Sequence, residues 1–327
     1  MLRFFLRRLF LLLFVVFGVM LLVFVVGRLI PGDPARVMLG ERATAEMVQN
    51  MRIKLGLDKP VVVQFGIYLG NVLRGDLGNS ITQFVPVSSI IKAHILPTIE
   101  LTLMSTLWAI VLGIPIGILA AVKKDTAFDY ISMGVALFGV SMPVFWIGLI
   151  LIIVFSVNLG WFPASGRTVG LFEGFWLMIS GGNFSAFGKA LSCIVMPSFA
   201  LGSMYAALIA RMARSSMLEV LGENFIETAR AKGLREVIVI NKHALKNALI
   251  PIVTVIGMQL GSLMGGAVLT ETVFAWPGIG RDLVDSIFSR DYPVFQGIIL
   301  FTATIFAVLN LVVDMIYVLL DPRIKYN

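Results

Sequence analysis

The sequence predicts an all-α membrane protein with six transmembrane helices. Of its 327 residues, 58% are hydrophobic and only 14% are charged, and the mean hydropathy is +0.94. Soluble globular proteins are about half apolar and about a quarter charged, so the charged residues here are too few to cover a water-exposed surface. The same composition excludes a disordered chain. One cysteine excludes an internal disulfide, and two histidines leave little room for a metal site.

The first expected span, residues 9–30, has no charge over residues 9–26 and follows three arginines in a short N-terminal segment, residues 1–8. It could be a signal peptide or a twin-arginine signal. The run is too long for either, and no small-x-small cleavage site follows it. We therefore expect a retained anchor, followed by a long outer loop over residues 31–97.

Five further runs approach the roughly 20 mostly apolar residues that a membrane-spanning helix needs. They fall within a transmembrane core over residues 98–320, at residues 98–122, 131–157, 194–210, 248–270 and 296–320. A shorter apolar stretch, residues 171–179, is expected to lie at an interface. The outer loop contains two amphipathic stretches, residues 46–55 and 62–73, which could form a platform for a partner.

The basic residues predict the orientation of the chain. Six spans put both termini on one side, and cytoplasmic loops of membrane proteins are enriched in Lys and Arg. With the N-terminus inside, the inner segments contain 14 of the 26 Lys and Arg and account for the whole net charge of +7. Seven of these cations lie in the longest inner loop, residues 211–247. We therefore expect a cytoplasmic N-terminus and a cytoplasmic C-terminus, residues 321–327.

That inner loop is expected to contain a short helix. Glu223 and Glu227 near its start and Arg230 near its end complement a helix dipole, and Gly233 suits the position just after a helix. Apolar and small side chains occur at helical spacing on one face: Phe225, Ile226 and Ala229. Such a helix could lie on the membrane surface or insert into a cleft of a cytoplasmic partner.

Residues 227–233, Glu-Thr-Ala-Arg-Ala-Lys-Gly, resemble the EAA loop of the permease subunits of ABC importers, in which Glu-Ala-Ala, three residues and Gly follow in order. Thr228 stands at the first Ala position of that pattern. Further segments resemble the peptide and nickel branch of the family, and in chain order they are residues 28–34, 143–148, 243–251, 270–281 and 321–324. The resemblance covers essentially the whole chain and is closest to the dipeptide/oligopeptide permease subunit with the long first outer loop.

The resemblance implies a type I importer fold in which this chain forms half of a pathway for di- or oligopeptides. The implied partners are a second homologous permease, two cytoplasmic ATPase subunits that bind ATP and Mg, and an extracytoplasmic binding protein. The chain itself would hold no cofactor and catalyse nothing, and it would reside in a bacterial or archaeal inner membrane. Nickel chelates, glutathione and oligosaccharides are alternative substrates.

An ion-coupled secondary transporter is an alternative class. Such a transporter predicts inverted repeats, and no convincing repeat is present in this sequence.

The resemblance implies that the short helix of the inner loop couples the permease to the ATPase subunits. The residues concerned are Glu223, Phe225, Ile226, Glu227, Ala229, Arg230 and Gly233.

Candidate pathway residues lie in the spans. Gly257, Gly261 and Gly265 repeat every four residues, which predicts close helix packing and could also give a smooth pathway wall. Charges within a span are functional candidates by default. Glu100 is expected to reach the interface, and Asp314 to pair with an inner-end arginine or contact substrate.

The segment after the fifth span is expected to fold as a cap near the outer mouth. It contains an aromatic and turn-forming triplet that is a candidate outer gate or docking point for an external partner: Trp276, Pro277 and Gly278.

Overall fold

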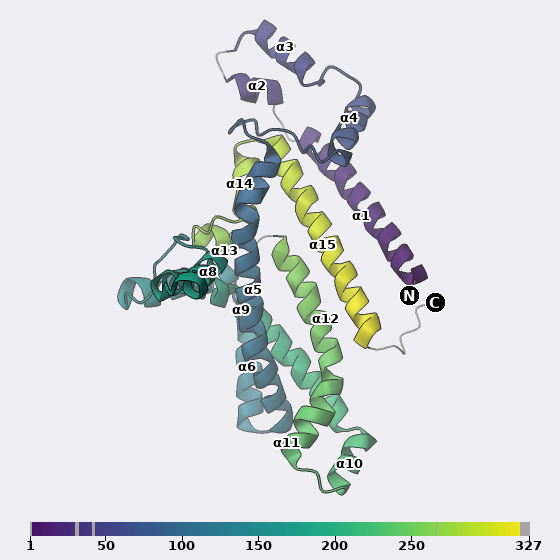
Figure 1. Cartoon of the computed structure of the whole chain (residues 1–327), viewed down its shortest axis with the longest axis vertical. Helices are drawn as coiled ribbons and strands as arrows, with labels where there is room; N and C mark the ends of the chain where they lie inside the picture. Colours follow the sequence, from purple (N-terminus) through teal and green to yellow (C-terminus); the bar gives the residue numbers. More distant parts are fainter. Residues whose placement is uncertain (1, 30–32, 41–42, 266, 321–327) are drawn as a thin grey trace.

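The computed structural model describes residues 2–29, 33–40, 43–265 and 267–320, except the side chains of residues 2–5, 314 and 316–320. Within these ranges the chain is helical, and the only β-type pairing is one isolated bridge between Asn79 and Pro86. The molecule is elongated, with small helices at both ends and long helices between them (Figure 1).

Five helices are long and apolar enough to cross a membrane, and a bent pair raises the number to six. The long helices are α1 (Leu2–Leu29), α5 (Val87–Val122), α9 (Phe184–Leu221), α12 (Leu245–Met264) and α15 (Tyr292–Leu320). They correspond to five of the six expected spans, and the fold is the expected all-α membrane protein. The helices run well past the apolar stretches. For example, α5 begins eleven residues before Thr98, because Lys92 and His94 interrupt the hydropathy but not the helix.

The third expected span is not one continuous helix. It consists of α6 (Ala127–Ser141) and then α7 (Val144–Leu151) with the π-helix η1 (Ile152–Asn158), and the two parts meet at 102°. Pro143 explains the break, because a proline disfavours helical conformation in the residue before it. Met142 is accordingly extended, with φ −80° and ψ 131°. Residues 131–157 are therefore bent rather than one straight helix, and by length and composition the pair can still form the third expected span.

Three helices form the outer loop, namely α2 (Pro34–Leu39), α3 (Ala45–Lys54) and α4 (Val61–Leu73). Asp33 caps α2 by accepting a hydrogen bond from the Ala35 amide at 3.1 Å, and it also pairs with Arg52 of α3 at 2.9 Å. Helix α4 packs on α1 through aromatic contacts between Phe65 and Phe24. The two expected amphipathic stretches thus correspond to α3 and α4.

The centre of the fold is the pair α5 and α9, which run side by side over most of their lengths. Small residues allow this close approach, because a Cβ added at Gly117 would meet the Ala210 carbonyl at 2.5 Å.

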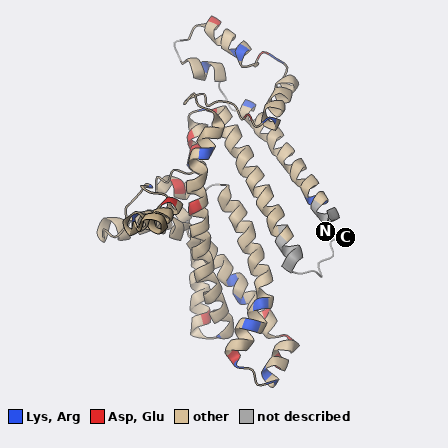
Figure 2. Cartoon of the chain, viewed as in Figure 1, with Lys and Arg blue, Asp and Glu red and all other residues tan. Residues whose placement is uncertain are grey.

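The described chain has six further short helical elements: α8 (Leu171–Gly181), α10 (Asn224–Ala231), α11 (Glu236–Ile238), the π-helix η2 (Val239–Ala244), α13 (Val268–Val273) and α14 (Ile279–Phe288). Charged residues are sparse along the described part of α15 (Figure 2).

Candidate functional site

Helix α10 lies at the end of the molecule opposite α2–α4 (Figure 1) and within the inner loop singled out by the sequence. Glu223 precedes it in extended conformation, as expected of an N-cap position. Gly233 follows it with φ +75°, and its amide donates to the Arg230 carbonyl at 2.9 Å. This left-handed conformation is costly for residues with a Cβ, so the predicted helix end at Gly233 is confirmed.

Two side chains attach α10 to the rest of the chain. Ile226 and Ala229 are buried, and they belong to one apolar cluster with residues of α5, α9, η2 and α12: Ala121, Met217, Val239, Ala244 and Ala248. Burying an isoleucine side chain contributes about 1.5–3 kcal/mol. Because protein interiors are close-packed, a displacement of α10 is transmitted to these helices.

The opposite side of α10 is exposed to solvent. It presents Glu223, Phe225, Glu227, Thr228 and Arg230, and Phe225 is 43% exposed. The expectation that Phe225 shares one docking face with Ile226 and Ala229 is therefore wrong. Ile226 and Ala229 are three residues apart and face the chain's own core, because in a helix this short an i, i+3 pair is enough to form the buried face. Phe225 faces outward.

Arg230 is paired within the loop itself. Its guanidinium donates two hydrogen bonds to Glu236 at the start of α11, at 2.7 and 3.2 Å. This interaction raises the pKa of Arg230 above its ordinary value. Both side chains are largely exposed, so the pair contributes about 0–1 kcal/mol and mainly fixes the path of the chain after α10.

A second ion pair nearby was not identified from the sequence. The Arg214 guanidinium of α9 donates to both carboxylate oxygens of Asp129, in the first turn of α6, at 2.5 and 2.6 Å. Asp129 is buried and also accepts the Asp125 amide at 3.2 Å. This fork joins the first turn of α6 to α9. Asp129 and Arg214 are 85 positions apart in the sequence, so no local pattern indicated that they pair.

The glycines of α12 lie against α15. A Cβ added at Gly257 would meet Val313 at 2.5 Å, and one added at Gly261 would meet the Phe306 ring at 3.1 Å. Gly265, the third member of the repeat, would meet only the Ser262 carbonyl of its own helix, at 3.2 Å. Two of the three glycines therefore allow close packing of these helices.

Glu100 is buried inside the protein. Its side chain is buried in α5 and accepts two hydrogen bonds from Arg167, at 2.9 and 3.1 Å, and one from the Phe172 amide at 3.2 Å. A buried carboxylate requires such compensation, because desolvating an unpaired charge is strongly unfavourable. The pair with Arg167 fixes the loop before α8. Asp314 lies on α15, and its side chain is outside the described residues.

The segment after α12, which the sequence predicts to be a cap, packs against α5 around Pro97 and Thr98. Trp276 is buried, and its indole Nε1 donates to the Pro97 carbonyl at 2.9 Å. The buried Glu271 carboxylate accepts the Arg281 amide at 2.9 Å and the Thr98 hydroxyl at 3.1 Å. Its desolvation raises the pKa of Glu271, although these hydrogen bonds oppose the shift.

Close packing around the Glu271 carboxylate explains why glycine occupies positions 278 and 280. Side chains added at Gly278 or Gly280 would overlap the Glu271 carboxylate. Because Trp276 is buried beneath this cap, it cannot itself contact an external partner in this conformation, and the exposed neighbours would have to do so.

Two further polar contacts join elements at the α2–α4 end of the molecule, and neither was predicted. His94 of α5 contacts the Asp282 carboxylate of α14 through its Nδ1 atom. Buried Asp291, just before α15, accepts hydrogen bonds from the Ser80 and Thr82 hydroxyls at 2.5 and 2.8 Å. In both contacts the partners come from segments about 190 to 210 residues apart, so no local pattern could identify them.

Comparison with protein families finds two matches that together cover nearly the whole chain. Residues 113–326 match the binding-protein-dependent transport system inner membrane component family. Residues 1–95 match the N-terminal region of the membrane component of the same transport systems.

Similar curated proteins match over their full length. The dipeptide transport system permease protein DppB of Alkalihalophilus pseudofirmus is 47% identical over 335 residues, and the di/tripeptide transport system permease protein DppB of Pseudomonas aeruginosa is 48% identical. The glutathione transport system permease protein GsiC of Pectobacterium atrosepticum is 43% identical over 327 residues. In all three comparisons 100% of both chains is covered.

Among solved structures, the inward-facing MetNI methionine ABC transporter is similar in fold. The TM-score is 0.55 at 18% sequence identity, over 71% of this chain and 96% of the matched chain. At this identity the likeness supports the arrangement of the helices alone.

Proposed function

The chain belongs to the family of binding-protein-dependent transport system inner membrane components, and from this we propose that it forms half of the pathway of an ATP-driven importer of di- and oligopeptides. It is a multi-pass membrane protein and a permease subunit, and the ATPase activity belongs to a separate subunit. The observation that carries the peptide assignment is the full-length identity of 44–48% to permeases named for dipeptide transport.

Helix α10 is proposed as the coupling helix. The supporting feature is its two-sided construction: Ile226 and Ala229 fasten it to the membrane helices, while Phe225 and Glu227 remain exposed. In the proposed cycle, ATP binding brings the two partner ATPases together and moves α10. The apolar cluster passes this movement to α9 and α12, and the pathway opens outward to receive peptide from the binding protein.

The coupling role can be tested by co-purification with the partner ATP-binding subunits. Phe225→Asp places a charge on the exposed face of α10 without touching the chain's own core. We expect this variant to insert at the normal level and to lose most of the co-purifying ATPase. Phe184→Asp is the matched control, because Phe184 is also exposed but lies at the other end of α9. Wild-type ATPase recovery with Phe225→Asp would refute the coupling role.

Gly233→Trp tests the same surface from the end of the helix. A Cβ added there would meet no atom within 4 Å. We expect normal insertion with blocked docking. Gly233→Asn, which tolerates the left-handed conformation with a small side chain, should retain docking.

We further propose that both termini and α10 are cytoplasmic, on the basis of the distribution of Lys and Arg. Single cysteines introduced at Arg74 and at Lys232 in a Cys193→Ser background test this orientation. A membrane-impermeant maleimide applied to intact cells should label position 74 and spare position 232. The reverse labelling would refute it.

Glutathione is the alternative substrate, because relatives named for glutathione transport are 42–43% identical over the full chain. Uptake assays with the assembled transporter in cells lacking other peptide importers distinguish the two. We expect labelled dialanine to accumulate in an ATP-dependent manner. Accumulation of glutathione without dialanine would overturn the peptide assignment and leave the permease assignment intact.

A further inference from the structure

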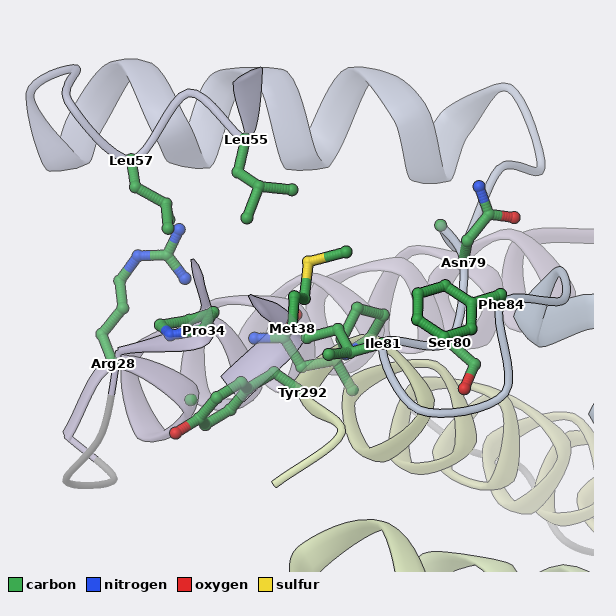
Figure 3. Close-up of a pocket in the computed structure, with 14 residues that line it drawn as sticks. Arg28, Pro34, Met38, Leu55, Leu57, Asn79, Ser80, Ile81, Phe84 and Tyr292 are labelled. Carbon is green, nitrogen blue, oxygen red and sulfur yellow. The ribbon is translucent and has the colours of Figure 1, made fainter. Parts of the chain in front are cut away.

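A hollow of about 600 Å³ lies at the outer-loop end of α1, bounded by α1, the outer loop and the start of α15 (Figure 3). Its polar lining includes Arg28, Asn79 and Tyr292. Most of the remaining lining is apolar: Pro34, Met38, Leu55, Leu57, Ile81 and Phe84. A second hollow of about 240 Å³ shares Arg28 and Gln296 with the first and adds Tyr68.

Arg28 contributes a positive charge that no carboxylate of the described residues balances at ion-pair distance. Its guanidinium donates to the neutral amide oxygen of Gln64, at 2.5 and 3.1 Å, and lies 3.9 Å from the centre of the Phe24 ring. Two nearby acids are otherwise engaged, since Asp33 pairs with Arg52 and Asp76 accepts the Gly78 amide. The charge of Arg28 therefore suits an anionic ligand.

Two phenol groups add unused hydrogen-bond donors. The hydroxyls of Tyr292 and Tyr68 are buried and have no hydrogen-bond partner within the described parts of the chain. Tyr292 is only 7% exposed and lines the larger hollow. Burial raises the pKa of Tyr68 to about 12, so its hydroxyl stays protonated near neutral pH and can donate. Leaving a buried donor unpaired is unfavourable, so these groups point to a missing acceptor.

The surroundings of the hollow place it at the boundary between lipid and water. Arg28 is in the last turn of α1, and just below it α1 exposes Leu21, Leu22 and Val25. The neighbouring helix α4 exposes a further apolar set: Val61, Val62, Val63, Ile67 and Leu73. Apolar surface of this kind is covered by lipid, while an Arg at a helix end sits at headgroup depth.

We propose that this hollow binds the phosphodiester headgroup of an anionic phospholipid from the leaflet at the α2–α4 end of the molecule. The Arg28 guanidinium would pair with the phosphate, as arginine does where its fork geometry matches phosphate oxygens. The Tyr292 and Tyr68 hydroxyls would donate to the remaining oxygens, and the apolar lining would contact the glycerol and the upper acyl chains.

A bound peptide fits the hollow less well. Its ammonium group needs an acidic partner, and no Asp or Glu lines the larger hollow among the described residues. Asp76 in the smaller hollow already accepts a backbone amide. The volume also exceeds what inorganic phosphate alone would fill, whereas a headgroup with its glycerol uses both the polar and the apolar lining.

The test is native mass spectrometry of the full chain, delipidated in dodecyl maltoside and titrated with palmitoyl-oleoyl phosphatidylglycerol. We expect the wild type to bind one lipid with the highest affinity. Arg28→Gln should weaken that binding by about tenfold or more, and Tyr292→Phe by about threefold, in line with charged and neutral hydrogen bonds. Arg28→Lys should retain part of the affinity. Arg74→Gln is the control, because Arg74 is an exposed cation of the same loop that borders neither hollow.

Three results would overturn the proposal. The first is equal lipid affinity in Arg28→Gln and Arg74→Gln. The second is displacement of the lipid by millimolar inorganic phosphate, which would make the site one for a free anion. The third is displacement by dialanine, which would make it a peptide site. Thermal unfolding of each variant is measured in parallel, and Tyr292→Phe, which preserves the ring, keeps the test decisive should Arg28→Gln fail to fold.

Discussion

The fork between Asp129 and Arg214 gives an asymmetric prediction for stability. The carboxylate is 1% exposed, whereas the guanidinium side chain is 26% exposed. Removing either partner breaks the same two hydrogen bonds but leaves a different group behind. We therefore expect Arg214→Gln to destabilise the chain more than Asp129→Asn.

The magnitudes follow from what remains after each change. Arg214→Gln strands a fully buried carboxylate whose remaining hydrogen-bond donor is the Asp125 amide, and breaking a buried pair in this way costs about 3–5 kcal/mol. Asp129→Asn strands a guanidinium that can reach water, and the new amide can still accept the Asp125 amide. The cost should then be about 1–3 kcal/mol, the range for a partly compensated polar group.

The free energy of unfolding can be measured by titrating the chain with sodium dodecyl sulfate in mixed micelles and following helicity by circular dichroism. Glu236→Gln is the matched control, because the Arg230–Glu236 pair has similar geometry but is exposed, and its loss should cost less than about 1 kcal/mol. The double variant Asp129→Asn/Arg214→Gln should be less destabilised than the sum of its parts. Equal costs for the two single variants, or the reverse order, would refute the reasoning.

Three further changes test other features. Gly233→Ala should destabilise by about 1–2 kcal/mol because its φ is left-handed, whereas Gly222→Ala, at φ −84° in the same loop, should be near neutral by the same unfolding assay. Gly257→Ala should cost about 1–3 kcal/mol through overlap with Val313, and repacking by an added Val313→Ala should restore part of it. The raised pKa of Glu271 means that its stabilising contribution is greatest below the unfolded pKa near 4.5 and declines as pH rises through the folded value. Glu271→Gln should accordingly flatten the fall in stability as pH rises above about 4.5, and an unchanged slope would contradict this.

Hydropathy was sufficient to locate most of the fold. In lipid, a single segment of about 20 apolar residues can satisfy its backbone hydrogen-bonding groups only by forming a helix. Five spans could therefore be predicted. The bend in the third span was missed because Met142 and Pro143 are themselves apolar and do not interrupt the hydropathy. Its signal was the proline, which restricts the preceding residue to extended conformation.

The candidate site was predictable where its features are local. Gly233 ends α10 because a left-handed residue must follow the helix, and this requirement is readable within a few positions. The partner of Glu100 was not readable, because Arg167 lies 67 positions away and only the tertiary fold brings them together. The two faces of α10 could not be assigned for a different reason: apolar spacing groups Phe225 with Ile226 and Ala229, and only the tertiary packing separates the buried pair from the exposed Phe225.

The division of α10 into a fastened and a free face has a mechanical consequence. The cluster around Ile226 includes Val239 and Ala244 of η2 and Ala248 of α12, so a force on α10 acts first on the inner end of α12. The π-helical turn between them, η2, interrupts the regular α-helical geometry, as π-helical turns often do at functional sites. Beyond it, α12 is held against α15 by the close approach at Gly257, which leaves little room for sliding. A movement delivered at α10 is therefore expected to tilt α12 and α15 together about η2 rather than to separate them.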